Sequence, residues 1–232
     1  MARRRSPDRY AALIQAAIQS FIQANGYRRA QVEDVAAAMG VAKGTVYLYA
    51  SSKAALFDLA VRHADDTVPP PEPDVLPVPT PAPGQTVDYL RQRMATEARF
   101  ERLQAAMASP AADVVAELND IVGEVFDTVA ANRVTIRLIN AAARDLPALA
   151  ALWFEGARAR LLSRLTAYLD ARVAAGALPA PPSTAAAARM IIETTLWFAV
   201  HRAWDPCPDG IPDELVRATI VGGLVRSLTG EP

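Results

Sequence analysis

Eight of the chain's 18 prolines lie between positions 69 and 83, in the segment "VPPPEPDVLPVPTPAPGQ". Proline lacks a backbone N–H and clashes with the preceding helical turn, so no regular helix can run through this segment. The prolines therefore separate residues 1–66 from residues 86–232. We expect an extended, semi-rigid connector over residues 67–85, with a proline-rich recognition ligand as the alternative.

Both flanking parts have a helical pattern. Aromatic residues make up only 6% of the chain, alanine, leucine and arginine are abundant, and we find no alternating strand pattern of useful length. The sequence thus predicts an all-α fold of about nine helices. In the longer part we expect helices near 86–108, 112–143 with a break around Asn132, 147–175, 184–204 and 212–228.

The first part begins with an amphipathic helix. Ser6 is a suitable N-cap and Pro7 suits the first helical position. The apolar stripe that follows comprises Ile14, Ala17, Ile18, Phe21 and Ile22. We expect this helix to end at Asn25-Gly26, with Gly26 in the left-handed conformation.

Two short helical stretches follow, "QVEDVAAAMG" and "AKGTVYLYA", with Gly40-Val41 between them. Neither would be stable alone, so both must pack on the first helix. Two short helices joined by a glycine-containing turn form a helix-turn-helix. Ser52 then marks the N-cap of a further helix.

Charge is distributed unevenly along the chain. Residues 1–62 contain nine Lys or Arg and four Asp or Glu, a net charge of +5, whereas the remainder has 15 basic and 21 acidic residues, a net charge of −6. This pattern favours a polyanion-binding end on an acidic body, although a chance fluctuation of a few charges is the simpler alternative.

The chain has only two lysines, and both lie in the stretch "VAKGTVYLYASSK". On a helix over 42–49, Lys43, Gly44, Tyr47 and Leu48 share an outward face, Val46 and Tyr49 turn inward, and Thr45 lies at the border. Lysine can reach guanine acceptors in the major groove and leucine a thymine methyl, while tyrosine and threonine hydroxyls can donate to phosphates. This face is therefore suited to DNA.

Lys53 occupies the first position of the next helix, where a cation is unfavourable for the helix dipole. A phosphate docked on that N-terminus would reverse the balance. A solvated surface charge is the alternative interpretation of Lys53.

Residues 10–63 resemble the DNA-binding domain of the tetracycline-repressor (TetR) family of transcriptional regulators. The resemblance runs without gaps through "AAIQSFIQANGY", "VEDVAAAMGVAKGTVYLY" and "SSKAALFDLAV". It implies that Lys43, Gly44, Thr45 and Tyr47 lie on the recognition helix and that Tyr49 and Lys53 contact backbone phosphates. It also implies a homodimer on a palindromic operator, joined through the last two helices.

Several positions depart from the family pattern. Ala30 and Gln31 stand where hydroxyl residues usually cap the second helix and contact phosphate, Leu48 replaces a polar or His residue, and Ala50 replaces a buried aromatic. We expect phosphate anchoring either to be weaker than is usual in the family or to shift to Arg28 and Arg29. The run Arg3–Arg5 could add a mobile arm on DNA or remain a solvated tail.

The longer part is where this family holds an effector. The candidate lining residues, each with core or dimer packing as the alternative, are Phe100, Met107, Phe126, Trp153, Phe154, Trp197 and His201. A face suited to packing between subunits comprises Ala187, Met190, Ile191, Thr194, Thr195, Phe198 and Arg202 with Ile220, Leu224 and Leu228.

The sequence therefore predicts a TetR-type helix-turn-helix DNA-binding domain (1–66), a connector (67–85) and an effector-binding and dimerisation domain (86–232). We expect a cytoplasmic, ligand-responsive regulator that acts as a repressor and is released from its operator by a small apolar or amphipathic effector. The alternatives are a protein-interaction module and a regulator with an activating or architectural role. We expect no catalytic set, metal or cofactor, because the chain has one Cys and two His that lie far apart. We also expect no membrane span, because the sequence has no long apolar run.

Overall fold

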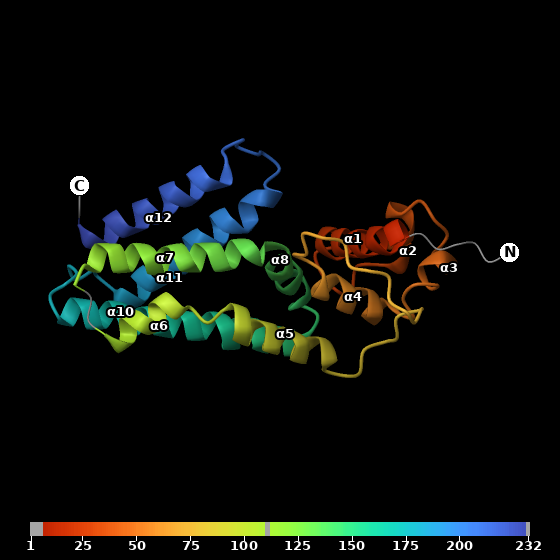
Figure 1. Cartoon of the computed structure of the whole chain (residues 1–232), viewed down its shortest axis with the longest axis horizontal. Helices are drawn as coiled ribbons and strands as arrows, with labels where there is room; N and C mark the ends of the chain where they lie inside the picture. The colour runs from red at the N-terminus through yellow and green to blue at the C-terminus, as the bar shows by residue number, and fades with distance from the viewer. Residues whose placement is uncertain (1–6, 110–111, 231–232) are drawn as a thin grey trace. The chain divides into compact units, whose positions relative to one another are not determined.

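The computed structural model of the chain describes residues 7–109 and 112–230 (Figure 1). Ser6 and the Arg3–Arg5 run lie outside the described residues. The elements that it describes are helices, with one isolated parallel bridge between Ala50 and Val78, so the all-α prediction is confirmed. The chain divides into two compact units: one runs through Arg91 and includes Val134–Trp153, and the other comprises Gln92–Arg133 and the residues from Phe154 onward.

Helix α1 (Pro7–Gln23) forms the base of the first unit. Ile14, Ala17, Ile18 and Phe21 of its apolar stripe are buried as expected, whereas Ile22 is half-buried. The end of the helix differs from the expectation, because Asn25 (φ 49°) takes the left-handed conformation. Gly26 has another role: a Cβ there would lie 2.7 Å from Oδ2 of Asp145, so glycine permits that carboxylate to approach.

Helices α2 (Val32–Ala38) and α4 (Lys53–Arg62) pack on α1, whereas α3 (Lys43–Val46) packs mainly on α2 rather than on the first helix as expected. Ser52 caps α4 as predicted, and its hydroxyl accepts a hydrogen bond from the Ala55 amide at 3.1 Å. An aromatic cluster joins α1 to α4 through Phe21, Tyr27 and Phe57, with ring centres 5.0–5.9 Å apart. Burial of these faces holds helices that are too short to be stable alone.

Helices α8 (Arg133–Ala142) and α9 (Pro147–Ala150) also belong largely to this first unit. The Asp65 carboxylate, just after α4, accepts hydrogen bonds from the Val134 and Thr135 amides at 2.7 and 3.0 Å. Beyond the other end of α8, Asp145 accepts from the Arg28 amide at 2.7 Å. Both ends of the α8 segment are thus attached to the helix-turn-helix unit by carboxylates.

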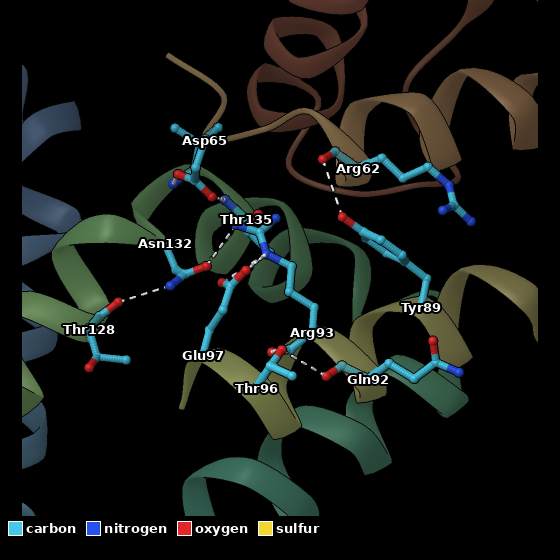
Figure 2. Close-up of polar contacts among 11 residues, drawn as sticks. Arg62, Asp65, Tyr89, Gln92, Arg93, Thr96, Glu97, Thr128, Asn132 and Thr135 are labelled. Carbon is cyan, nitrogen blue, oxygen red and sulfur yellow. Dashed lines mark hydrogen bonds and ion pairs between the residues drawn. The ribbon is translucent and has the colours of Figure 1, made fainter. Parts of the chain in front are cut away.

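The connector does not project away from the first unit. It returns to α4, where the Thr86 hydroxyl donates to Asp58 at 2.7 Å. The Arg62 guanidinium lies 4.2 Å from the centre of the Tyr89 ring, and the Tyr89 hydroxyl donates to the Arg62 carbonyl at 3.4 Å (Figure 2). The first turns of α5 (Gln85–Glu97) are therefore fixed on α4.

The second unit is a helical bundle (Figure 1). Within it α7 packs on α11 and α12, α10 packs on α11, and α6 packs on α7 and α10. The bounds of its elements are α6 (Glu101–Ala108), α7 (Val114–Ala131), π-helix η1 (Ala151–Arg158), α10 (Ala159–Ala174), α11 (Thr184–Ala199), 3-10 helix η2 (His201–Trp204) and α12 (Asp213–Thr229).

Long helices expected from the sequence are subdivided. The one expected over 86–108 breaks at Phe100 (φ 52°), where the Glu124 carboxylate accepts from the Arg102 and Leu103 amides at the start of α6. The break expected around Asn132 is present: Asn132 ends α7 and donates to the Thr128 carbonyl at 3.1 Å (Figure 2). Side-chain hydrogen bonds to backbone groups at these helix ends, from distant Glu124 and from Asn132 itself, explain why the breaks are stable.

A polar cluster lies inside the second unit. Arg172 is only 8% exposed and binds both carboxylate oxygens of Glu117, at 2.7 and 3.0 Å. It also donates to the carbonyls of Ala106 and Ser109 at 2.7 and 3.3 Å. Tyr168 donates to Glu117 at 2.8 Å. Together these bonds join α6, α7 and α10.

Candidate DNA-binding interface

The recognition segment presents the face that the sequence predicted. Only Lys43–Val46 form α3, but the amides of Tyr47 to Ala50 continue to bond to carbonyls three or four residues earlier, so the turn extends to Ala50. Tyr47 is 38% and Leu48 52% exposed, whereas Val46 is fully buried. Thr45 is half-buried, at the border, and nothing lies within 4 Å of a Cβ built on Gly44. The outward face is thus open for close approach of another surface.

Tyr49 requires a correction. The family resemblance assigned it to a phosphate, but its side chain is only 2% exposed. The helical periodicity had placed it inward, and the structure agrees with that placement. A buried phenol cannot reach a phosphate on the surface of a duplex, so Tyr49 supports the fold of the recognition segment instead.

Lys43 is already paired on the protein surface. Its ammonium donates to the Glu33 carboxylate at 2.6 Å and lies 5.9 Å from the centre of the Tyr47 ring. The hydrogen bond with Glu33 raises the pKa of Lys43 and lowers the pKa of Glu33. Both side chains are about half exposed, so water and salt screen the pair and it can open readily.

Lys53 is neither a free surface charge nor a simple N-terminal cation. It donates to the Arg28 carbonyl at 3.0 Å and lies 4.9 Å from the centre of the Tyr27 ring. Partial burial lowers its pKa. An ammonium has three N–H donors, so this geometry leaves donors for a phosphate while fixing where the charge lies.

Arg28, Arg29 and Gln31 form the exposed loop between α1 and α2. The side-chain amide of Gln31 donates to the Arg29 carbonyl at 3.2 Å. The backbone amide of Gln31 donates to the Asp34 carboxylate at 2.8 Å. Asp34, in the first turn of α2, therefore satisfies the backbone amide of the N-cap residue Gln31. Because Lys53 binds the Arg28 carbonyl, the basic residues of this loop and of α4 lie at one edge of the unit.

The effector candidates do not enclose a site together. Phe126 and Trp153 are buried, and Phe100 and His201 are half-buried. Met107, Phe154 and Trp197, by contrast, are 43–50% exposed, so they lie at the surface rather than around a buried ligand. Trp153 and Phe154 also fall in different units. Trp197 and His201 are in ring contact, with centres 5.9 Å apart.

A small cavity of about 120 Å³ lies in the first unit, between α1 and the residues after α4. Its lining includes Ile14, Val68 and the His63–Asp66 pair, whose side chains meet at 2.7 Å. Ligand pockets usually measure about 300–1,000 Å³, so this cavity is too small for an effector. Among the described residues, no group of three or more His, Cys, Asp or Glu could hold a metal ion.

Sequence reasoning missed the residues that organise this surface. Glu33, Asp65 and Asp145 act through contacts with residues far away in the sequence, and no local sequence pattern indicates these partners. For Arg172 the sequence offered only its spacing, one helical turn after Tyr168, which places the two side chains on the same face of a helix. In the structure both bind Glu117.

An exposed helix-turn-helix with a basic edge, joined to a separate helical bundle, defines a DNA-binding regulator. Residues 13–60 match the family model of bacterial regulatory proteins of the tetR family, and residues 116–223 match the C-terminal domain of AefR-like transcriptional repressors. The chain belongs to the TetR family of transcriptional regulators, and it is not an enzyme.

Three solved structures are similar to this chain, and the likeness to the first of them, AibR, shows the fold. AibR in complex with isovaleryl coenzyme A and operator DNA is 17% identical, with 95% of this chain and 98% of that chain covered and a TM-score of 0.51. A TetR-like regulator from Rhodococcus sp. RHA1 is 16% identical, with 97% and 98% covered and a TM-score of 0.48. FadR from Bacillus subtilis, in complex with stearoyl-CoA, is 18% identical, with 93% and 97% covered and a TM-score of 0.45. A search of curated protein sequences gave no match.

In residues 7–109 and 112–230, no helix is both long and apolar enough to cross a membrane.

Proposed function

We propose that this regulator binds a palindromic DNA operator as a homodimer, represses transcription in the cytoplasm and is released by a small amphipathic effector. The observation that carries the proposal is the open outward face of the recognition segment. Lys43, Tyr47 and Leu48 are exposed there, on a turn held by buried Val46 and Tyr49. A cation and a short apolar chain match guanine acceptors and a thymine methyl in the major groove.

A basic edge supports the same proposal. Arg28, Arg29 and Lys53 lie beside the recognition segment, where they can neutralise phosphates and fix the register of the helix on the duplex. Such contacts release counterions, so binding should weaken steeply as salt rises.

The DNA-binding test begins with duplexes selected from genomic fragments by the purified protein. Fluorescence anisotropy then compares Lys43→Ala and Tyr47→Ala with Arg102→Ala and Met107→Ala, which change exposed residues of the second unit. Each recognition variant should lose roughly tenfold or more in affinity, and the controls should bind as the unaltered protein does. Equal binding by all four variants would mean that the recognition segment does not read DNA.

Leu48 provides a test of sequence readout. Replacing Leu48 with alanine removes the apolar contact proposed for a thymine methyl, so the preference for thymine at one operator position should relax while non-specific binding stays the same. A duplex series with thymine or uracil at each position measures this effect, because uracil lacks the methyl group.

The proposed dimer uses the last two helices, but of the residues that the sequence suggested for it several are buried inside the chain, whereas Met190 remains exposed. Ala187, Ile191, Thr195, Leu224 and Leu228 are buried within the chain, so they pack α11 and α12 inside the bundle. Large apolar side chains that remain exposed are Met190 (40%) and Trp197 (50%) on α11 and Leu215 (56%) on α12. Exposed apolar groups on adjacent helices favour burial against a second copy.

Sedimentation measures this interface. Trp197→Glu should convert the dimer to a monomer, because a carboxylate cannot be buried there without a partner. Met107→Glu is the matched control, since Met107 is similarly exposed on α6. A dimer that survives Trp197→Glu would exclude this face.

The ligand of a solved structure with this fold supports the proposed effector class. AibR was solved with isovaleryl coenzyme A and operator DNA. An acyl thioester of coenzyme A joins an apolar chain to a polar head, and it fits the amphipathic effector proposed for this chain. Titrating isovaleryl coenzyme A against the DNA complex should release the duplex; free coenzyme A is the control. Ligands that bind without changing DNA affinity would refute release.

A further inference from the structure

The proline-rich connector lies against the end of the recognition segment. We define residues 76–80 (Leu-Pro-Val-Pro-Thr) as the strap. The Val78 amide donates to the Tyr49 carbonyl at 2.8 Å, and the Ser51 amide donates to the Val78 carbonyl at 3.0 Å. These bonds form the parallel bridge between Ala50 and Val78. The strap therefore pairs with the backbone directly after the exposed DNA-reading residues.

Thr80 adds a second attachment through hydroxyl groups. It donates to the Ser52 hydroxyl at 2.7 Å and lies 3.1 Å from the Ser51 hydroxyl. Ser52 in turn accepts from the Ala55 amide and caps α4. A continuous set of hydrogen bonds thus runs from the strap, through the cap, into α4.

The turn between α3 and α4 needs such support. Helix α3 has four residues, and a helix of that length is not stable alone. Ala50 is fully buried although its side chain is small, so it provides little apolar area to hold the turn. Without the strap, the Ser51 amide and the Tyr49 carbonyl would lose the partners that the structure gives them.

The prolines lower the conformational entropy that the strap loses when it pairs. Pro77 and Pro79 flank Val78 and restrict its backbone before folding, so less conformational freedom is lost when it pairs. Downstream, Thr86 and Tyr89 attach the same segment to α4. The strap is therefore attached through Val78 and Thr80, and the residues that follow it are attached to α4 in the same unit.

We infer that the strap positions the DNA-reading face, and that Val78 and Thr80 are positioning residues for operator recognition although neither needs to touch DNA. This inference rests on the proposed function. Loosening the strap should let Tyr47 and Leu48 adopt several orientations, which costs affinity for the matched operator more than affinity for unrelated DNA.

The experiment replaces Thr80 with valine, which keeps the shape and removes the hydroxyl, and with serine, which keeps the hydroxyl. Anisotropy measures binding to the genomically selected duplex and to a scrambled duplex of the same composition. Thr80→Val should lower the ratio of the two affinities roughly fivefold, and Thr80→Ser should restore it. A merely structural role would lower the melting temperature of Thr80→Val and leave the affinity ratio unchanged.

A backbone variant tests the bridge separately. Val78→Pro removes the amide that donates to Tyr49, whereas Val75→Pro changes an exposed valine three residues earlier. Val78→Pro should lower the affinity ratio roughly tenfold, and Val75→Pro should leave it unchanged. If Val78→Pro does not fold, Thr80→Val still decides the question.

Failure of the proposed function and failure of the strap inference give different results in these experiments. If the unaltered protein does not distinguish the selected duplex from the scrambled one, the proposed function fails. If it does distinguish them and both Thr80→Val and Val78→Pro keep the full ratio, the strap inference fails and the proposed function stands.

Discussion

Replacing Arg172 with methionine should destabilise the helical bundle of the second unit severely. Methionine fills most of the same volume, so the change removes the charge and its hydrogen bonds with little loss of packing. Glu117 would then remain as a carboxylate whose side chain is only 14% exposed, and the Ala106 and Ser109 carbonyls would lose their donor.

The magnitude follows from these losses. Removing one partner of a buried ion pair costs about 3–5 kcal/mol, because the remaining charge is left without compensation. The free energy of unfolding of a domain is about 5–15 kcal/mol, so the variant would lose a large part of it. Arg102→Met is the matched control: Arg102 meets Asp120 at 3.7 Å with both side chains well exposed, and it should cost less than about 1 kcal/mol.

Urea unfolding followed by tryptophan fluorescence measures the difference. With a slope of about 2 kcal/mol per molar urea, Arg172→Met should lower the midpoint by roughly 1.5–2.5 M. Adding Glu117→Gln removes the orphaned charge and keeps an acceptor for Tyr168, so the double variant should recover part of the loss. A midpoint that moves by less than about 0.3 M, or a double variant less stable than the single one, would refute the reasoning.

Three further outcomes are expected. Asp65→Asn should weaken the cap on α8 and cost about 0.5–2 kcal/mol of the first unit's stability in thermal unfolding, with no loss if the cap is unimportant. Glu33→Gln should free Lys43 and tighten binding to every duplex roughly threefold in anisotropy; unchanged binding would show that the pair does not compete with DNA. The Arg202 guanidinium donates to both carboxylate oxygens of Asp209, at 2.7 and 2.6 Å, and lowers the pKa of Asp209 to about 2. The stabilisation from this pairing is therefore fully present above the ordinary pKa near 3.8 and is lost as pH falls toward 2. A fluorophore on Cys207, the single cysteine, should report loosening of that loop between pH 4 and 2, and a change only above pH 4 would contradict it.

Local patterns allowed much of the DNA-binding unit to be predicted. The hydroxyl of Ser52 caps α4, and Lys43, Tyr47 and Leu48 face outward, because capping and helical periodicity depend only on neighbours in sequence. Tyr49 shows the limit of assigning roles by resemblance, since its burial follows from the periodicity of this chain.

Contacts between distant residues could not be predicted in this way. The Arg28 carbonyl that binds Lys53 is a backbone group, which carries no residue-specific signal. The Asp145 carboxylate meets the Arg28 amide across 117 positions. The strap also pairs through backbone atoms of Val78, so its prolines predicted an extended segment without indicating where it docks.

The attachment of α8 through Asp65 and Asp145 has a consequence for the order in which the protein is made. A ribosome releases the helix-turn-helix residues first, but the carboxylate that binds the Arg28 amide is synthesised more than a hundred residues later. N-terminal segments usually fold as units during synthesis. Here the DNA-binding unit acquires its last contacts only after α5, α6 and α7 have left the ribosome. A nascent chain stalled before α8 should therefore carry a helix-turn-helix that is more sensitive to protease than the same residues in the finished protein.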